Sequence, residues 1–122
     1  MTKKIEMGRL GEDYAFNYLI SKGYKIQVRN WRMAHYELDI IAIHNNQLVI
    51  VEVKTRSAAI YETNEEAITP NKIRFLVNAT EAYIMEHDIQ LETRFDVIFI
   101  KWYREGKYEL EHIENAFTAP VN

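Results

Sequence analysis

The stretch from Tyr36 to Arg56 constrains the fold more than any other part of the chain. It contains two runs of alternating residues in which both faces are largely apolar, joined by Asn45-Asn46. Asparagine tolerates the positive φ angles of a two-residue turn, so the pattern predicts a β-hairpin covered on both sides. Charged residues nevertheless stand toward the ends of these runs: Glu37, Asp39, Glu52 and Lys54. Charges at covered positions need a physical explanation.

The turn also predicts the register of the hairpin. If position 44 pairs with position 47, counting back places Asp39 opposite Glu52 and Glu37 opposite Lys54. Side chains paired in this way have Cβ atoms about 4.5–5.5 Å apart, so two ionised carboxylates would repel each other. Either one carboxyl keeps a proton, or a hard divalent cation lies between the two.

Lys54 lies two residues after Glu52 and therefore on the same face of its strand. A metal held by two acids beside an ammonium suits phosphodiester hydrolysis, because the metal polarises the phosphoryl oxygen and acidifies a bound water. The alternative is a salt-bridge cluster on an exposed face, in which Glu37 pairs with Lys54 and an acid pairs with Arg56. The apolar neighbours on that face favour the covered site, and Glu37 is then the expected partner of Lys54.

Length and composition bound the remaining possibilities. The 122 residues predict a single domain spanning 1–122. The chain has no cysteine and no apolar run long enough for a bilayer, which predicts a cytoplasmic protein without a membrane partner. The net charge of −3 does not indicate a nucleic-acid binder. Residues 1–56 carry nine basic and six acidic side chains, however, so this part of the chain becomes clearly basic if a metal neutralises its acids.

Two helices are predicted around the hairpin. Gly8 to Lys22 has the apolar spacing of a helix, and Glu12 lies beside its apolar stripe. A carboxylate favoured by the helix dipole and a functional carboxylate both remain open for this position. Thr69-Pro70 supply the N-cap and first residue of a second helix that ends near residues 87–88. Lys72 falls in its first turn, where the dipole disfavours a cation, so it either contacts phosphate or lies on a solvated surface.

The rest of the chain predicts further strands and irregular segments. Strands are expected at Tyr24–Trp31, Arg94–Tyr103 and Tyr108–Ile113, a loop at Ser57–Ile68, and a tail from Asn115 to Asn122. In the first strand and its continuation, Trp31 is expected in the core and Arg32 is a candidate phosphate contact.

The order helix, three strands, helix and strand, with acids on the second and third strands, resembles the restriction-endonuclease-like, PD-(D/E)xK nuclease superfamily. Glu52-Val53-Lys54 matches the ExK half of the motif and Asp39 matches its first acid, although Leu38 stands where proline is usual. The expected fold is therefore α/β with a restriction-endonuclease-like core. Its mixed sheet is flanked by helices and carries an additional C-terminal strand.

The wider pattern is similar to the YraN family of uncharacterised bacterial proteins, which are predicted to have nuclease activity. The matching pieces are Gly8-x-x-Gly11-Glu12, Asn30-Trp31-Arg32, Glu37-Leu38-Asp39, Glu52-Val53-Lys54-Thr55-Arg56, Thr69-Pro70-x-Lys72, Arg94-Phe95-Asp96-Val97 and Glu114-Asn115-Ala116-Phe117. One departure is Tyr36, where the family usually has glycine.

These resemblances imply a Mg²⁺- or Mn²⁺-dependent endonuclease acting on DNA, including branched or otherwise structured DNA, and they imply a homodimer. Archaeal Holliday-junction resolvases, which share the fold, place a first-helix glutamate at the active site. The implied roles are catalytic for Glu12, Asp39, Glu52 and Lys54, metal-binding for Asp39 and Glu52, supporting for Glu37, and nucleic-acid-binding for Arg32, Arg56 and Lys72. The alternative is a nuclease-fold module that binds nucleic acid or a protein with little or no catalysis.

Overall fold

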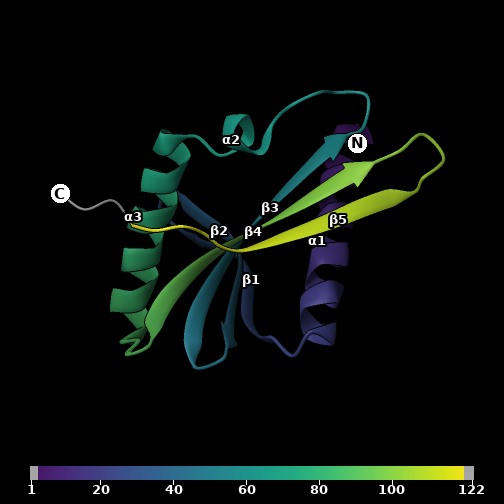
Figure 1. The fold of residues 1–122 in the computed structure, drawn as a ribbon. Helices are drawn as coiled ribbons and strands as arrows, with labels where there is room; N and C mark the ends of the chain where they lie inside the picture. The colour runs from purple at the N-terminus through teal and green to yellow at the C-terminus, as the bar shows by residue number, and fades with distance from the viewer. Residues whose placement is uncertain (1–2, 120–122) are drawn as a thin grey trace.

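The computed structural model describes residues 3–119, which form one mixed β-sheet between helical layers (Figure 1). The sheet has the order β1-β2-β3-β4-β5, with β3 and β4 parallel and every other pair antiparallel. Its elements are α1 (Lys3–Ser21), β1 (Lys25–Met33), β2 (Tyr36–His44), β3 (Gln47–Ser57), α2 (Asn64–Ala67), α3 (Pro70–His87), β4 (Glu92–Trp102) and β5 (Tyr108–Phe117). This α/β arrangement confirms the predicted order of elements and agrees with a nuclease-like fold.

The β2–β3 hairpin has the predicted turn and register. Asn45 and Asn46 have φ angles of 50° and 61°, and His44 pairs with Gln47 across the turn. The two strands then pair residue by residue as far as Ile40 and Val51. Asparagine at both turn positions therefore sets which residues meet further along the hairpin.

Both faces of the hairpin are covered, as the two apolar faces predict. Ile40 and Val51 pack with α1 in one core, whereas Ile41 and Ile50 pack with α3 in the other. All four residues are at most 2% exposed. A charged side chain next to these four residues is therefore close to a helix and largely shielded from solvent.

The helices begin and end largely as the sequence signals indicate. Helix α1 starts at Lys3, earlier than the predicted Gly8, and Gly23 at φ 88° follows its end. In α3, the Thr69 side chain accepts a hydrogen bond from the Lys72 backbone N–H. Asp88 ends α3 in the left-handed conformation. Within residues 3–119, no helix is long and apolar enough to cross a membrane.

Two predicted boundaries were wrong. The loop expected at Ser57–Ile68 contains the short helix α2, which Thr63 caps through its side chain. The last strand does not end at Ile113 but continues to Phe117. Asn115 has a φ of 51° and the register of β4 and β5 shifts there, so the alternating pattern is interrupted although the pairing continues.

Candidate active site

The β2–β3 pairing stops where the predicted acids begin. Asp39 and Glu52 lie one step beyond Ile40–Val51, the last pair of the ladder. There the Val53 backbone N–H donates to the Asp39 carboxylate, with 2.8 Å between nitrogen and Oδ2. A side chain thus accepts the hydrogen bond of a strand residue, and the two strands separate at the acids.

Asp39 does not behave as an ordinary surface acid. The pKa of its carboxyl is raised to about 8. Burial is the largest cause, and the neighbouring Glu52 carboxylate is the next. The hydrogen bond from Val53 and the charge of Lys72 act in the opposite direction but are the weaker influences. Asp39 therefore holds a proton at neutral pH when no cation is present, which is the first of the two solutions expected for this pair.

Glu52 is neutralised by a lysine from α3. Its side chain is 8% exposed, and its Oε2 lies 3.2 Å from Lys72 Nζ. This contact explains why a cation occupies the first turn of α3, since the carboxylate attracts Lys72 more than the helix dipole repels it. Lys72 was predicted to contact phosphate, and the structure places it directly beside a candidate metal ligand.

Glu12 reaches the site from the other helical layer. Burial raises the pKa of Glu12, and the charge of Asp39 is the next largest cause. The approach depends on Gly11, because a Cβ atom there would lie 2.2 Å from the Thr55 hydroxyl oxygen. Glycine at this position therefore allows α1 to press against β3 and brings Glu12 near Asp39 where the strands separate.

A cavity of about 670 Å³ opens at this point. Its walls include Glu12 from α1, Asp39 from β2 and Lys54 from β3, so three elements contribute the predicted catalytic residues. The further lining residues are Met7, Gly8, Val53, Thr55, Arg56, Ser57, Ile60 and Glu62. Glu52 is buried and contacts Lys72, and it does not line the cavity.

The other predicted residues have different partners from those expected. The Glu37 carboxylate lies 3.4 Å from the Arg32 guanidinium, and no ion pair with Lys54 occurs among residues 3–119. Glu37 therefore does not hold Lys54, whose side chain borders the cavity. Arg56 donates to the Glu62 carbonyl and to the Asn64 side chain, so in the structure it ties down the loop after β3.

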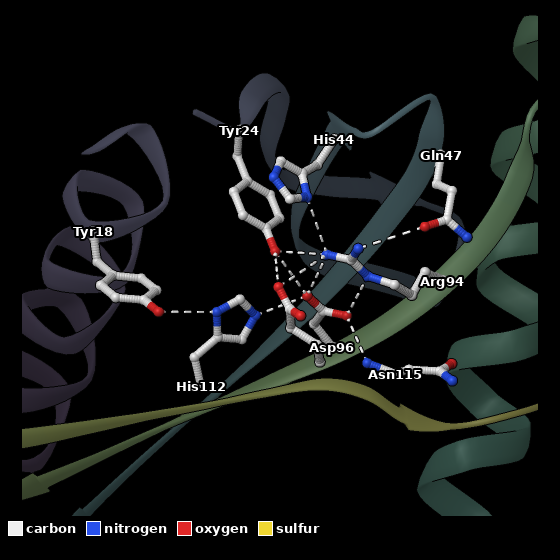
Figure 2. Close-up of polar contacts among 9 residues, drawn as sticks. Tyr18, Tyr24, His44, Gln47, Arg94, Asp96, His112 and Asn115 are labelled. Atoms are coloured by element: carbon white, nitrogen blue, oxygen red, sulfur yellow. Dashed lines mark hydrogen bonds and ion pairs between the residues drawn. The ribbon is translucent and has the colours of Figure 1, made fainter. Parts of the chain in front are cut away.

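A second polar cluster, which the sequence did not lead us to expect, lies near the start of β4 (Figure 2). Asp96, His112 and Glu114 could hold a metal ion, since one ligand atom from each lies within 4.8 Å of the others. Two signals in the sequence could have revealed it. Asp96 lies on a strand of mostly apolar residues, and His112 and Glu114 are two residues apart on the neighbouring strand.

Protein donors already surround Asp96, which is fully buried. Arg94 donates to both carboxylate oxygens at 2.9 and 3.0 Å, and the Asn115 backbone N–H donates to Oδ1 at 3.0 Å. His112 Nε2 lies 2.7 Å from Oδ2. These hydrogen bonds lower the pKa of Asp96 although its burial acts to raise it. The guanidinium thus supplies the positive charge that a metal would supply, and it fills the space between the acids.

The fold and the site together define an α/β domain with a nuclease-like core and an acidic centre at the point where two strands separate. The chain belongs to the uncharacterised protein family UPF0102, the YraN family, whose model matches residues 11–100. Proteins named UPF0102 protein from Parabacteroides distasonis and Bacteroides thetaiotaomicron are 44% and 43% identical to it over 121 residues. A third, from Phocaeicola vulgatus, is 40% identical. Each alignment covers at least 98% of both chains, which confirms the resemblance drawn from the motifs.

Proposed function

We infer that this protein is a metal-dependent endonuclease that hydrolyses phosphodiester bonds in DNA, including branched or otherwise structured DNA. The observation that carries this inference is the Asp39 carboxyl, whose pKa burial and Glu52 raise, at the wall of a cavity that Lys54 also lines. Two carboxyls held together against their mutual repulsion make a natural site for a hard divalent cation.

The donor set suits Mg²⁺ or Mn²⁺. Asp39 and Glu52 offer carboxylate oxygens, and the hydrogen bond from Val53 occupies only one side of the Asp39 carboxyl. The Val53 carbonyl is a candidate further ligand. In the Asp96 cluster, by contrast, Arg94, His112 and the Asn115 backbone N–H already occupy both oxygens of the aspartate. We therefore assign the metal to Asp39 and Glu52.

A bound divalent cation would polarise the phosphoryl oxygen and lower the pKa of the attacking water. Lys54 reaches the cavity and can orient that water or offset negative charge in the transition state. Glu12, whose pKa is raised, can accept a proton from the water or support the metal. Lys72, whose Nζ lies 3.2 Å from Glu52 Oε2, keeps Glu52 in place.

The decisive test is cleavage of linear duplex, single-stranded and four-way-junction DNA, with Mg²⁺, with Mn²⁺ and with EDTA. We expect metal-dependent cleavage that Lys54→Ala reduces by two orders of magnitude or more. Lys25→Ala is the matched control, because Lys25 lies at the other end of the hairpin, opposite Ile43. Cleavage that persists unchanged in Lys54→Ala would show that the activity belongs to another site or to a contaminant.

The metal assignment has its own test. Calorimetric titration of Mn²⁺ should give binding to the wild type and to Glu114→Gln, and none to Asp39→Asn. If Glu114→Gln abolishes Mn²⁺ binding and Asp39→Asn retains it, the metal site is the Asp96 cluster. Glu114 suits this comparison because its side chain is 57% exposed, so the amide needs no buried partner.

The Lys72–Glu52 contact favours one alternative. Because an ammonium already lies at one carboxylate, the chain could be a nuclease-fold module that binds nucleic acid or a protein without catalysis. DNA binding without hydrolysis under every metal condition would establish that function. A homodimer and a cytoplasmic location remain predictions, and sedimentation analysis of the purified protein tests the first of them.

A further inference from the structure

The loop between β3 and α2 carries an exposed apolar side chain that lines the cavity and an exposed aromatic side chain at the next position. Ile60 is 60% exposed and lines the cavity that Asp39 and Lys54 also line. Tyr61, the next residue, is 90% exposed. Large apolar side chains at such exposure, next to a site for an anionic substrate, call for a partner that is itself partly apolar.

The backbone of this loop is held at both ends. After β3, the Ala58 backbone N–H donates to the Trp102 carbonyl at 2.7 Å, and the Ile60 N–H donates to the Ser57 carbonyl. Before α2, the Arg56 guanidinium donates to the Glu62 carbonyl at 2.9 Å. In Figure 1 the loop runs from the tip of β3 across to α2. The two apolar side chains are therefore presented from an anchored turn beside the cavity.

Three of the cations near the site already have protein partners and therefore supply little binding energy for a phosphate backbone. Arg32 lies against Glu37, Arg56 is bound to the loop, and Lys72 lies against Glu52. The chain as a whole carries a net charge of −3. Proteins that bind duplex DNA mainly through phosphates need several free cations for that purpose. Because Lys54 is then the main cation left at the cavity, we expect binding there to use further contacts in addition to charge.

An exposed tyrosine and an exposed isoleucine suit an unstacked base. Every base has a face that can stack on an aromatic ring, and apolar side chains insert at steps where stacking is broken. Inside an intact duplex the bases are stacked on each other, so a side chain near the phosphate meets mostly the anionic backbone. Exposed side chains of this kind therefore suit DNA with an unstacked base better than an intact duplex.

We propose that Ile60 and Tyr61 contact an unstacked base next to the scissile phosphate, so that the substrate is DNA with unpaired nucleotides at the cut. This inference rests on the proposed nuclease function and names its substrate class. Tyr61 is a positioning residue: it holds the base, and the acids and Lys54 act on the phosphate.

The test measures binding in EDTA, so that hydrolysis plays no part. Fluorescein-labelled DNA of one sequence is used as a single strand, as a blunt duplex, and as a duplex with an unpaired bulge. The wild type should bind the single strand and the bulged duplex more tightly than the blunt duplex. Tyr61→Ala should weaken binding to the single strand and the bulged duplex by about fivefold or more, the factor that matches the lower range of base stacking. Its affinity for the blunt duplex should change less than twofold.

Two variants make the result specific. Tyr61→Phe keeps the ring and should bind as the wild type does. Met85→Ala removes another exposed apolar side chain, 82% exposed near the far end of α3 from Lys72, and should leave all three affinities unchanged. 2-Aminopurine at the unpaired position should lose fluorescence with the wild type and regain it with Tyr61→Ala, as expected for a base stacked on the ring.

The proposal is overturned if the wild type binds the blunt duplex as tightly as the other forms, if it binds none of them, or if Tyr61→Ala weakens all three equally. Cleavage with Mg²⁺ or Mn²⁺ is recorded separately on the same DNA. Metal-dependent cleavage without these binding differences refutes the base contact alone. Binding differences without cleavage refute the nuclease function alone.

Discussion

Replacing Asp39 with asparagine should stabilise the protein at pH 8. The pKa of this carboxyl rises from an ordinary 3.8 to about 8 on folding. Between those values the folded state keeps a proton that the unfolded state has released, so the free energy of unfolding falls as pH rises. At about 1.36 kcal/mol for each pKa unit, this rise in pKa corresponds to a loss of about 5–6 kcal/mol in the free energy of unfolding. Water that reaches Asp39 from the cavity screens its charge, so we expect an actual loss of about 2–4 kcal/mol.

The amide of Asp39→Asn cannot ionise and keeps an oxygen that can accept the hydrogen bond from Val53. The free energy of unfolding of the variant should therefore exceed that of the wild type by about 2–4 kcal/mol at pH 8. At pH 4.5 the two free energies should differ by less than about 1 kcal/mol. Urea denaturation in EDTA at both pH values measures the two differences. Mg²⁺ added at pH 8 should stabilise the wild type and leave the variant unchanged, because only the wild type offers the carboxylate.

Asp96→Asn provides a control of opposite sign. The pKa of Asp96 is lowered on folding, so its charge stabilises the protein above the unfolded pKa, and this stabilisation is lost as pH falls through the folded pKa. Its replacement should therefore be destabilising at pH 8 and less so in acid. If Asp39→Asn is destabilising at pH 8 as well, the folded protein does not disfavour the ionised Asp39 carboxylate. The reasoning about the metal site then fails.

Two further predictions concern packing around the two acidic clusters. Gly11→Ala should destabilise the protein by about 1–3 kcal/mol in urea, because the added Cβ meets the Thr55 hydroxyl, and Thr55→Ala should recover part of the loss. Full stability of Gly11→Ala would show that α1 does not press on β3 there. Arg94→Met should cost about 3–5 kcal/mol by the same measurement, since Asp96 would remain buried without its cation. A neutral outcome would mean that His112 alone can balance Asp96.

The hairpin could be predicted from sequence because its determinants are local. Asn45-Asn46 specifies the turn, and alternation along each strand then places every residue on a face. Asp39 and Glu52 were for this reason predicted as neighbours before any fold was known. The separation of the strands at that point was not predicted, since it depends on the hydrogen bond from Val53 to a side chain.

The contacts between distant elements could not be predicted in this way. Lys72 stood out as a cation in the first turn of a helix, but its partner Glu52 lies on a strand twenty residues away. Glu12 was seen to lie beside an apolar stripe, yet its approach to Asp39 requires the close packing of α1 on β3. Sequence patterns thus identified unusual positions, and tertiary packing decided their partners.

The buried Asp96 and the partly buried Asp39 of this sheet are stabilised in different ways, and the difference argues for function at only one of them. Asp96 is surrounded by Arg94, His112 and a backbone N–H, so its charge is balanced permanently. Asp39 lies where the strands separate and is balanced by a proton that can leave. A carboxyl kept only for stability would gain from a fixed partner such as Arg94, or from replacement by an amide. A removable proton at the wall of a cavity is what a site needs if it is to exchange that proton for a metal ion.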